Sequence, residues 1–195
     1  MMRAAVIAVL ASVTLAPVHA IELSQKGNTA LLSGTIKDGD QYLLRDFLAR
    51  PEAAQIRQVQ LNSAGGRTWP AREMARIIRN AGLATVVDAS RNACESACTG
   101  LFVAGVRRHY VNARAVPDGE GQRGPGLGFH EGNSLHASGK RGYSGGATAD
   151  MVNIYYEMGV SGAASLVTRS AYNRMYRLSG PTALSLGIAT SLSPP

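Results

Sequence analysis

Short apolar stretches alternate with amphipathic stretches along most of the chain. Alternating or mainly apolar positions predict strands over 29–36, 55–61, 83–87, 109–116 and 127–130. Apolar positions at helical spacing predict helices over 41–50, 70–82, 97–106, 148–158 and 163–176. Strands that alternate with helices indicate an α/β fold with parallel strands and right-handed crossovers.

Two segments interrupt this alternation. Residues 117–126 (PDGEGQRGPG) combine Pro, Gly and charged residues, and residues 133–146 are rich in Gly and Ser. Both compositions predict loops. The sequence contains no internal repeat and no linker between two cores, so we expect residues 21–195 to form a single domain.

Residues 1–20 (MMRAAVIAVLASVTLAPVHA) have the composition of a secretory signal peptide. An arginine precedes an apolar run, and the small-residue ending Val18-His19-Ala20 predicts cleavage after Ala20. The run is shorter than the stretch of about 20 residues that spans a membrane. An uncleaved anchor is the alternative. No later segment of the sequence is long and apolar enough to span a bilayer, so we expect a periplasmic or secreted protein without a transmembrane segment.

The composition is basic, with 20 Lys and Arg against 13 Asp and Glu. The densest basic pairs, Arg107-Arg108 and Lys140-Arg141, lack the interleaved aromatic residues of a nucleic-acid platform. We therefore expect a solvated basic surface and no nucleic-acid partner. Weak attraction to anionic envelope surfaces is compatible with this charge.

The two cysteines lie on either side of one serine in the stretch RNACESACTG (91–100). Three interpretations are open: Ser96 is a nucleophile on a tight turn, the cysteines are a structural clip, or the cluster is a buried turn of small residues. Export to an oxidising compartment favours a Cys94–Cys98 disulfide. Within a regular helix the two Cβ atoms would lie about 6 Å apart, which is too far for a relaxed bridge. Cys94 is therefore expected in the turn before the helix.

Ser96 follows a predicted strand and precedes a predicted helix of small residues. The helix N-terminus would favour negative charge beside this serine, although a serine there is also a common N-cap. A serine nucleophile needs a base, usually histidine. His109 follows two arginines and His136 lies in a predicted loop, whereas His130 ends a short apolar strand. His130 is therefore the expected general base.

The stretch LNSAGG (61–66) places two glycines at the end of a predicted strand. Gly65 and Gly66 have no Cβ atoms, so a substrate carbonyl could lie against their backbone. Their N–H groups would suit a developing oxyanion. A plain strand-to-helix turn is the alternative.

These motifs occur in an order that resembles the Clp protease proteolytic subunit and its wider Clp/crotonase superfamily. The resemblance covers about 29–190. It rests on GTI-DGD before a helix, LNSAGG before a helix, ACESACTGLFVAG, NAR followed by LGFH, and the closing LSGPTALSLGIAT. It implies a spiral of β-β-α units with parallel strands and crossover helices. The serine-to-histidine spacing is longer than in the protease, and the extra length falls in 117–126.

The resemblance implies roles for individual residues. Ser96 matches the nucleophile, His130 the general base, and Gly66 and Ala97 the two backbone donors of the oxyanion hole. The third member of the protease triad, an aspartate, has no counterpart in RSAYNRMYRLSG (169–180). The nearest polar candidates are Ser170 and Asn173. Asp150, further upstream, is expected to cap the helix that follows it.

We therefore expect an exported serine hydrolase, a peptidase, that acts on a peptide or acyl substrate without a metal or cofactor. One alternative is a binding module of the same fold that holds such a ligand without turnover. Another is an envelope scaffold that acts through oligomer contacts. Relatives form rings or trimers through the region after the histidine, so the resemblance implies a homo-oligomer of unspecified size.

Overall fold

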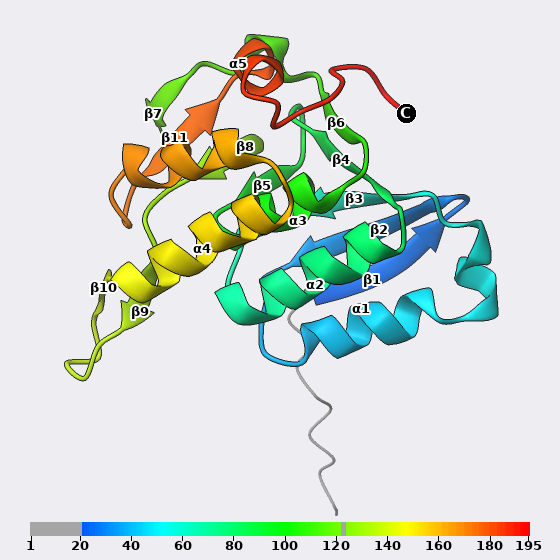
Figure 1. The fold of residues 1–195 in the computed structure, drawn as a ribbon, viewed down its shortest axis with the longest axis horizontal. Helices are drawn as coiled ribbons and strands as arrows, with labels where there is room; N and C mark the ends of the chain where they lie inside the picture. The colour runs from blue at the N-terminus through cyan, green and yellow to red at the C-terminus, as the bar shows by residue number, and fades with distance from the viewer. Residues whose placement is uncertain (1–20, 122–123) are drawn as a thin grey trace, which may run out of the picture.

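The computed structural model describes residues 21–121 and 124–195, and the expected signal peptide lies outside them. A five-stranded sheet forms the centre of the N-terminal half, in the order β1-β2-β3-β4-β6 (Figure 1). Its strands are β1 (Ile21–Lys26), β2 (Thr29–Gly34), β3 (Gln58–Asn62), β4 (Ala84–Asp88) and β6 (Arg108–Val111). β1 and β2 form an antiparallel hairpin, and the remaining neighbours pair in parallel.

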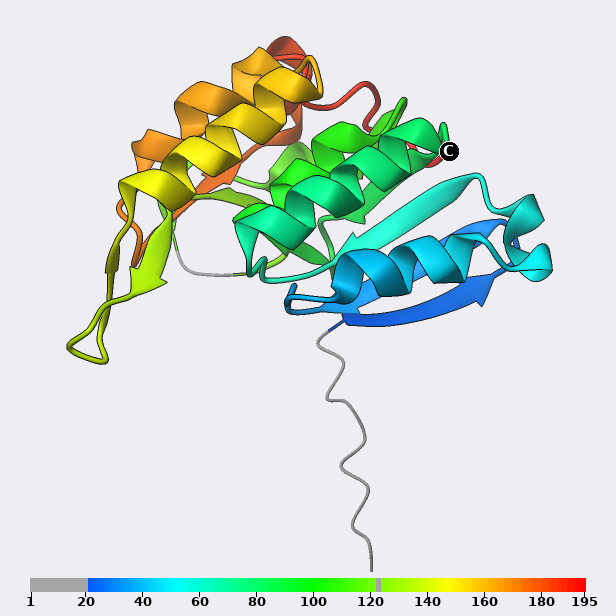
Figure 2. The same ribbon diagram turned by 60° about the horizontal axis from the view of Figure 1, so that its bottom comes forward.

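Helices cover one face of this sheet, as the colours of Figures 1 and 2 show. They are α1 (Asp40–Leu48), α2 (Thr68–Asn80) and α3 (Ala97–Ala104). The alternation in β3 buries Val59 and Leu61 completely, and the apolar stripe of α2 buries Met74 and Ile78. Parallel pairing with helical crossovers confirms the predicted α/β class.

A second, four-stranded sheet has the order β5-β8-β11-β7. It contains β5 (Ala93–Glu95), β7 (Gly119–Gly121), β8 (Gly126–Phe129) and β11 (Met175–Leu178). β5 pairs with β8 in parallel, and β11 pairs antiparallel with both β8 and β7. An isolated parallel bridge between Ser63 and Cys94 joins the end of β3 to β5. The end of the large sheet therefore leads directly into the small one.

The structure corrects four sequence predictions. The strand predicted over 109–116 ends at Val111, and a 3₁₀ turn follows it. The helix predicted over 163–176 is a 3₁₀ segment, η3 (Ser161–Arg169), followed by β11. The loop predicted over 133–146 holds the hairpin β9 (Asn133–Leu135) and β10 (Arg141–Tyr143), which extends beyond the rest of the chain in Figure 2. The loop predicted over 117–126 contains β7. The remaining elements are η1 (Pro51–Gln55), η2 (Ala113–Ala115), α4 (Gly145–Glu157) and α5 (Gly180–Ser185). Over 21–121 and 124–195, no helix has both the length and the apolar character to cross a bilayer.

Candidate active site

A cavity of about 780 Å³ opens between the loop from β2 to α1 and the β9–β10 hairpin. Both Ser96 and His130 line it, as do Gly65 and Gly66. The strand pairing explains why these residues meet. Glu95 of β5 is in register with Gly128 of β8. Ser96 directly follows Glu95 and His130 lies two residues after Gly128, so the parallel strands bring both to the same edge of the small sheet.

Ser96 occupies an unusual backbone conformation, with φ 54° and ψ −128°, between the end of β5 and the start of α3. Positive φ is rare for a residue with a Cβ atom, and such strained residues concentrate at functional sites. The Ser96 N–H donates to the carbonyl of Gly128 over 2.8 Å, which fixes the turn against β8. The Ser96 hydroxyl makes no capping hydrogen bond with α3. The interpretation of this side chain as an ordinary helix N-cap is therefore wrong.

The turn is held on its α3 side by buried polar contacts. The Thr99 hydroxyl donates to the Ser96 carbonyl over 2.6 Å, and Thr99 Oγ1 lies 2.6 Å from the Tyr155 hydroxyl of α4. Because Thr99 uses its proton on the carbonyl, the Tyr155 hydroxyl donates to Thr99. Burial raises the pKa of Tyr155 well above its usual range, which keeps this donor protonated.

A disulfide joins Cys94 and Cys98 across the turn, with their Cα atoms 5.2 Å apart. Both cysteines are fully buried. Cys94 lies in strand β5 and not in the predicted turn, whereas Cys98 lies in the first turn of α3. The bridge therefore crosses the strand-to-helix turn, with Cys94 outside the helix as the spacing required. The bridge, which agrees with the sequence prediction, brackets Ser96 in a short closed loop.

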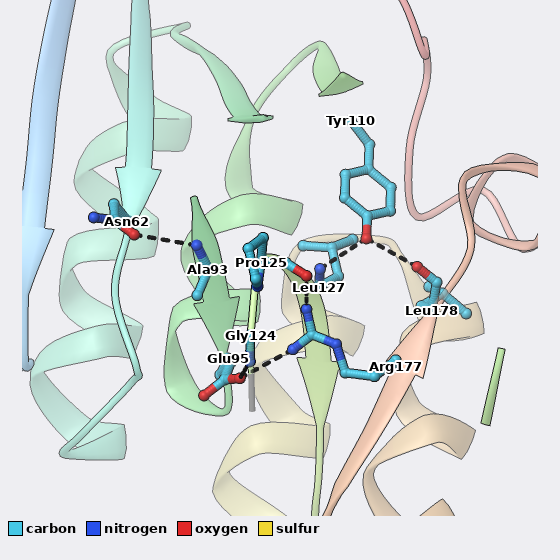
Figure 3. Close-up of polar contacts among 9 residues, drawn as sticks. All are labelled: Asn62, Ala93, Glu95, Tyr110, Gly124, Pro125, Leu127, Arg177 and Leu178. Carbon is cyan, nitrogen blue, oxygen red and sulfur yellow. Dashed lines mark hydrogen bonds and ion pairs between the residues drawn. The ribbon is translucent and has the colours of Figure 1, made fainter. Parts of the chain in front are cut away.

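A buried ion pair supports β5 directly before the serine (Figure 3). Arg177 of β11 donates to the Glu95 carboxylate over 3.0 Å, and only 7% and 2% of the two side chains are exposed. The Glu95 carboxylate also accepts from the Gly124 N–H, and Arg177 donates to the Pro125 carbonyl. These contacts link β5 to β11 across β8, and sequence reasoning did not find them because the partners are 82 residues apart.

His130 follows β8 and is 2% exposed. Its Nδ1 lies 2.6 Å from the carbonyl oxygen of Glu131. A carbonyl can only accept, so this contact places the proton on Nδ1 and leaves Nε2 as the acceptor that a general base requires. The Gly132 N–H donates to the Thr148 hydroxyl of α4, which anchors the segment after His130.

The other two histidines of the described residues lie elsewhere. His109 is in β6, and its Nδ1 is 2.9 Å from the Ser193 carbonyl oxygen. His136 is exposed in the turn of the β9–β10 hairpin. Neither lines the cavity, so His130 is the histidine that the structure brings to the same cavity as Ser96.

The glycine pair lies close against the serine turn. Gly65 has φ 86°, and a Cβ atom there would come within 2.6 Å of the Glu95 carbonyl oxygen and 2.9 Å of the Ala97 nitrogen. Only glycine permits this approach. The Gly65 carbonyl accepts from the Ile36 N–H, and the Arg67 N–H donates to the Ile36 carbonyl. The peptide N–H of Gly66, between them, points away from Ile36 because backbone groups alternate along an extended segment.

The Ala97 N–H is also available for a substrate. Ala97 is the first residue of α3, and the first N–H groups of a helix have no acceptor within it. The helix dipole adds partial positive charge at the same point. Gly65 packs against the Ala97 nitrogen, so the N–H groups of Gly66 and Ala97 belong to two segments in close contact. Two such backbone donors would suit a developing oxyanion.

The structure does not bring Ser170 or Asn173 to the cavity. The Ser170 hydroxyl donates to Glu120 over 2.9 Å, and its carbonyl accepts from the Glu131 N–H. Asn173 is exposed in the turn before β11. The observed contact to His130 Nδ1 is instead a main-chain carbonyl, which residue types cannot reveal. Asp150 does not cap a helix either: it lies inside α4, lines the cavity and accepts from the Thr68 hydroxyl.

No group of three or more His, Cys, Asp or Glu side chains within 21–121 and 124–195 is arranged to hold a metal ion.

A parallel sheet with crossover helices and a serine turn facing a glycine pair define an α/β protein of the Clp/crotonase fold. The structure is similar to a mutant of the 1510-N membrane-bound stomatin-specific protease, with a TM-score of 0.56, 11% identity, and coverage of 84% of this chain and 77% of the other. A mutant of the same protease in complex with a substrate peptide also matches, with a TM-score of 0.56 and 11% identity over 84% of this chain and 73% of the other.

An enoyl-CoA hydratase from Thermoplasma volcanium is similar as well, with a TM-score of 0.50, 14% identity, and coverage of 89% of this chain and 71% of the other. No protein-family model and no curated protein matches the sequence. At such low identities the likeness establishes the Clp/crotonase fold, which confirms the predicted architecture.

Proposed function

We propose that the protein is a serine hydrolase that cleaves peptides, with Ser96 as nucleophile and His130 as general base. The observation that carries this proposal is the strained Ser96 turn, whose hydroxyl is not used as a helix cap and which borders the same cavity as His130. The stomatin-specific protease, which shares the fold, has been captured with a substrate peptide.

In the proposed reaction, His130 Nε2 takes the proton of the Ser96 hydroxyl as Oγ attacks the substrate carbonyl carbon. The carbonyl oxygen becomes an oxyanion, which the N–H groups of Gly66 and Ala97 stabilise. The protonated imidazole then gives its proton to the leaving amine, and the C–N bond breaks to leave an ester on Ser96. Water, deprotonated by His130, hydrolyses the ester and restores the serine.

The contact at His130 Nδ1 predicts slow turnover. A main-chain carbonyl holds the ring in the correct tautomer, but it carries no full charge to stabilise the imidazolium. In a well-studied serine protease, loss of the orienting carboxylate lowers kcat about 10⁴-fold. The same observation favours the second candidate function, a protein of this fold that binds a peptide or acyl ligand without cleaving it.

Labelling with a fluorophosphonate probe tests the proposal. Wild-type protein should be labelled. Ser96→Ala should abolish labelling because it removes the reacting hydroxyl, and His130→Ala should reduce the labelling rate by at least about 100-fold, since a general base contributes about 10²–10⁴-fold. His136→Ala is the matched control, because His136 is exposed and does not line the cavity. Its labelling should equal that of the wild type.

Ser170→Ala and Asn173→Ala should also be labelled at the wild-type rate, because neither residue lines the cavity. Folded wild-type protein that is never labelled would contradict the hydrolase and favour the binding module.

We further propose that the protein is exported and matures by cleavage between Ala20 and Ile21. The signal-like composition of residues 1–20 supports this, and so does the disulfide, which persists in oxidising compartments. Mass spectrometry of the protein purified from the envelope fraction tests this proposal, and it should find Ile21 at the N-terminus. Assembly into a homo-oligomer remains a proposal from the family resemblance, to be checked by the solution mass of the purified protein.

A further inference from the structure

We propose that the substrate of this site carries a carboxylate close to the scissile bond, either an acidic side chain or the C-terminal carboxylate of a peptide. The inference rests on the proposed peptidase function and adds the substrate class. The charged residues around the cavity carry it.

Cations outnumber carboxylates in the lining of the cavity. Lys37, Arg67 and Arg141 line it, and Asp150 is the one carboxylate among the described residues that do so. Lys37 lies in the loop between β2 and α1, and Arg141 lies in β10 of the hairpin. The two cations therefore reach the cavity from two different elements, and Ser96 and His130 line the same cavity.

The partners of these groups leave the cations available. Asp150 accepts from the Thr68 hydroxyl over 3.0 Å. Arg67 pairs with Asp38 over 3.3 Å, but both side chains are about two-thirds exposed, at 68% and 66%, so the pair is weak. Arg141 donates to the neutral Asn133 side chain. Within the described parts of the chain, neither Lys37 nor Arg141 forms an ion pair with a carboxylate.

The cavity also offers apolar contact area suited to a peptide. Trp69 and Leu135 line it, and 54% and 69% of their surfaces are exposed. A cleft lined by charge of one sign raises the local concentration of oppositely charged ligands. Together the exposed apolar side chains and the unpaired cations fit a peptide with an acidic residue beside an apolar one.

Binding is measured by fluorescence anisotropy on Ser96→Ala protein, which removes turnover from the assay. Three labelled peptides of equal length are compared: one with internal Glu residues and an amidated C-terminus, its Gln counterpart, and the Gln peptide with a free C-terminal carboxylate. We expect one of the two carboxylate-bearing peptides to bind roughly 2- to 30-fold more tightly than the neutral peptide, from two partly screened cations. The preference should shrink in high salt.

The variant Lys37→Gln/Arg141→Gln should abolish this preference while retaining affinity for the neutral peptide. Lys140→Gln is the matched control, because Lys140 neighbours Arg141 on the exposed hairpin but does not line the cavity. It should keep the full preference. Circular dichroism of each variant verifies the fold.

Equal binding of the acidic and neutral peptides, or no binding of any peptide, would overturn the carboxylate preference. A preference that survives in the Lys37→Gln/Arg141→Gln variant would overturn the role of these cations. If fluorophosphonate never labels the wild-type protein but the carboxylate preference is present, the hydrolase proposal is overturned and the carboxylate-binding proposal is retained. The two proposals therefore fail separately.

Discussion

At the scale of single residues, the backbone of Ser96 gives a stability test of the strained turn. We expect Ser96→Gly to unfold with a free energy about 1 kcal/mol higher than Ser96→Ala, because glycine tolerates φ 54° whereas alanine keeps strain that costs on the order of 1–3 kcal/mol. In a chain of this size, that difference raises Tm by about 2–4 °C. Thermal and chemical denaturation of both variants measure it.

The control is Ser33 in β2, which is not among the residues with positive φ. There the order should reverse, with Ser33→Gly less stable than Ser33→Ala, because glycine loses more backbone entropy in a strand. If Ser96→Gly is no more stable than Ser96→Ala, the turn is not strained in solution.

The residue scale also separates what the sequence could reveal from what it could not. Ser96, His130 and the glycine pair could be singled out from the sequence as residues of one cavity, because a proposed nucleophile, a proposed base and a close backbone approach each restrict the residue types. The Glu131 carbonyl that contacts His130 was not predictable, since every residue type supplies a carbonyl. Ser170 was chosen as a polar neighbour, but its hydroxyl donates to Glu120 instead.

At the scale of elements, the sequence predicted well where one hydrophobic period ran unbroken. The helices α1 and α2 carry clear amphipathic stripes, and β3 and β4 are flanked by turn residues. The helix predicted over 163–176 failed because the apolar residues of η3 and β11 follow one another with only a short turn between them. β11 is recognisable as a strand only through its antiparallel pairing with β8 and β7, which lie far away in the sequence.

The β9–β10 hairpin was missed for a related reason. It pairs over only three residues on each side and is largely exposed, so it shows no strong alternation. The hairpin is held by a hydrogen bond just beyond its two strands: the Ser144 N–H, at the start of α4, donates to the Gly132 carbonyl. This weakly patterned element nevertheless carries Arg141 and Leu135 to the cavity. The part of the site that we propose sets substrate preference was therefore the least predictable.

At the scale of the whole molecule, Tyr110 joins the two sheets. It belongs to β6 of the large sheet, and its buried hydroxyl accepts from the Leu127 N–H of β8 and donates to the Leu178 carbonyl of β11, both over 2.9 Å (Figure 3). In Tyr110→Phe these groups lose their partner inside the core. We expect the free energy of unfolding near neutral pH to fall by about 1–3 kcal/mol, as measured by chemical denaturation.

The same hydroxyl gives the fold a predictable response to alkaline pH. Burial raises the pKa of Tyr110 from 10.0 to about 12. A raised pKa in the folded state means that the unfolded chain loses the phenolic proton first, so the stabilisation is complete below pH 10 and is lost as the pH rises through about 12. Between these values wild-type protein should lose on the order of 2 kcal/mol more stability than Tyr110→Phe. Tyr143→Phe, which alters a tyrosine that is 51% exposed, should follow the wild-type curve. Parallel pH curves for wild type and Tyr110→Phe would show that this hydroxyl does not hold the two sheets together.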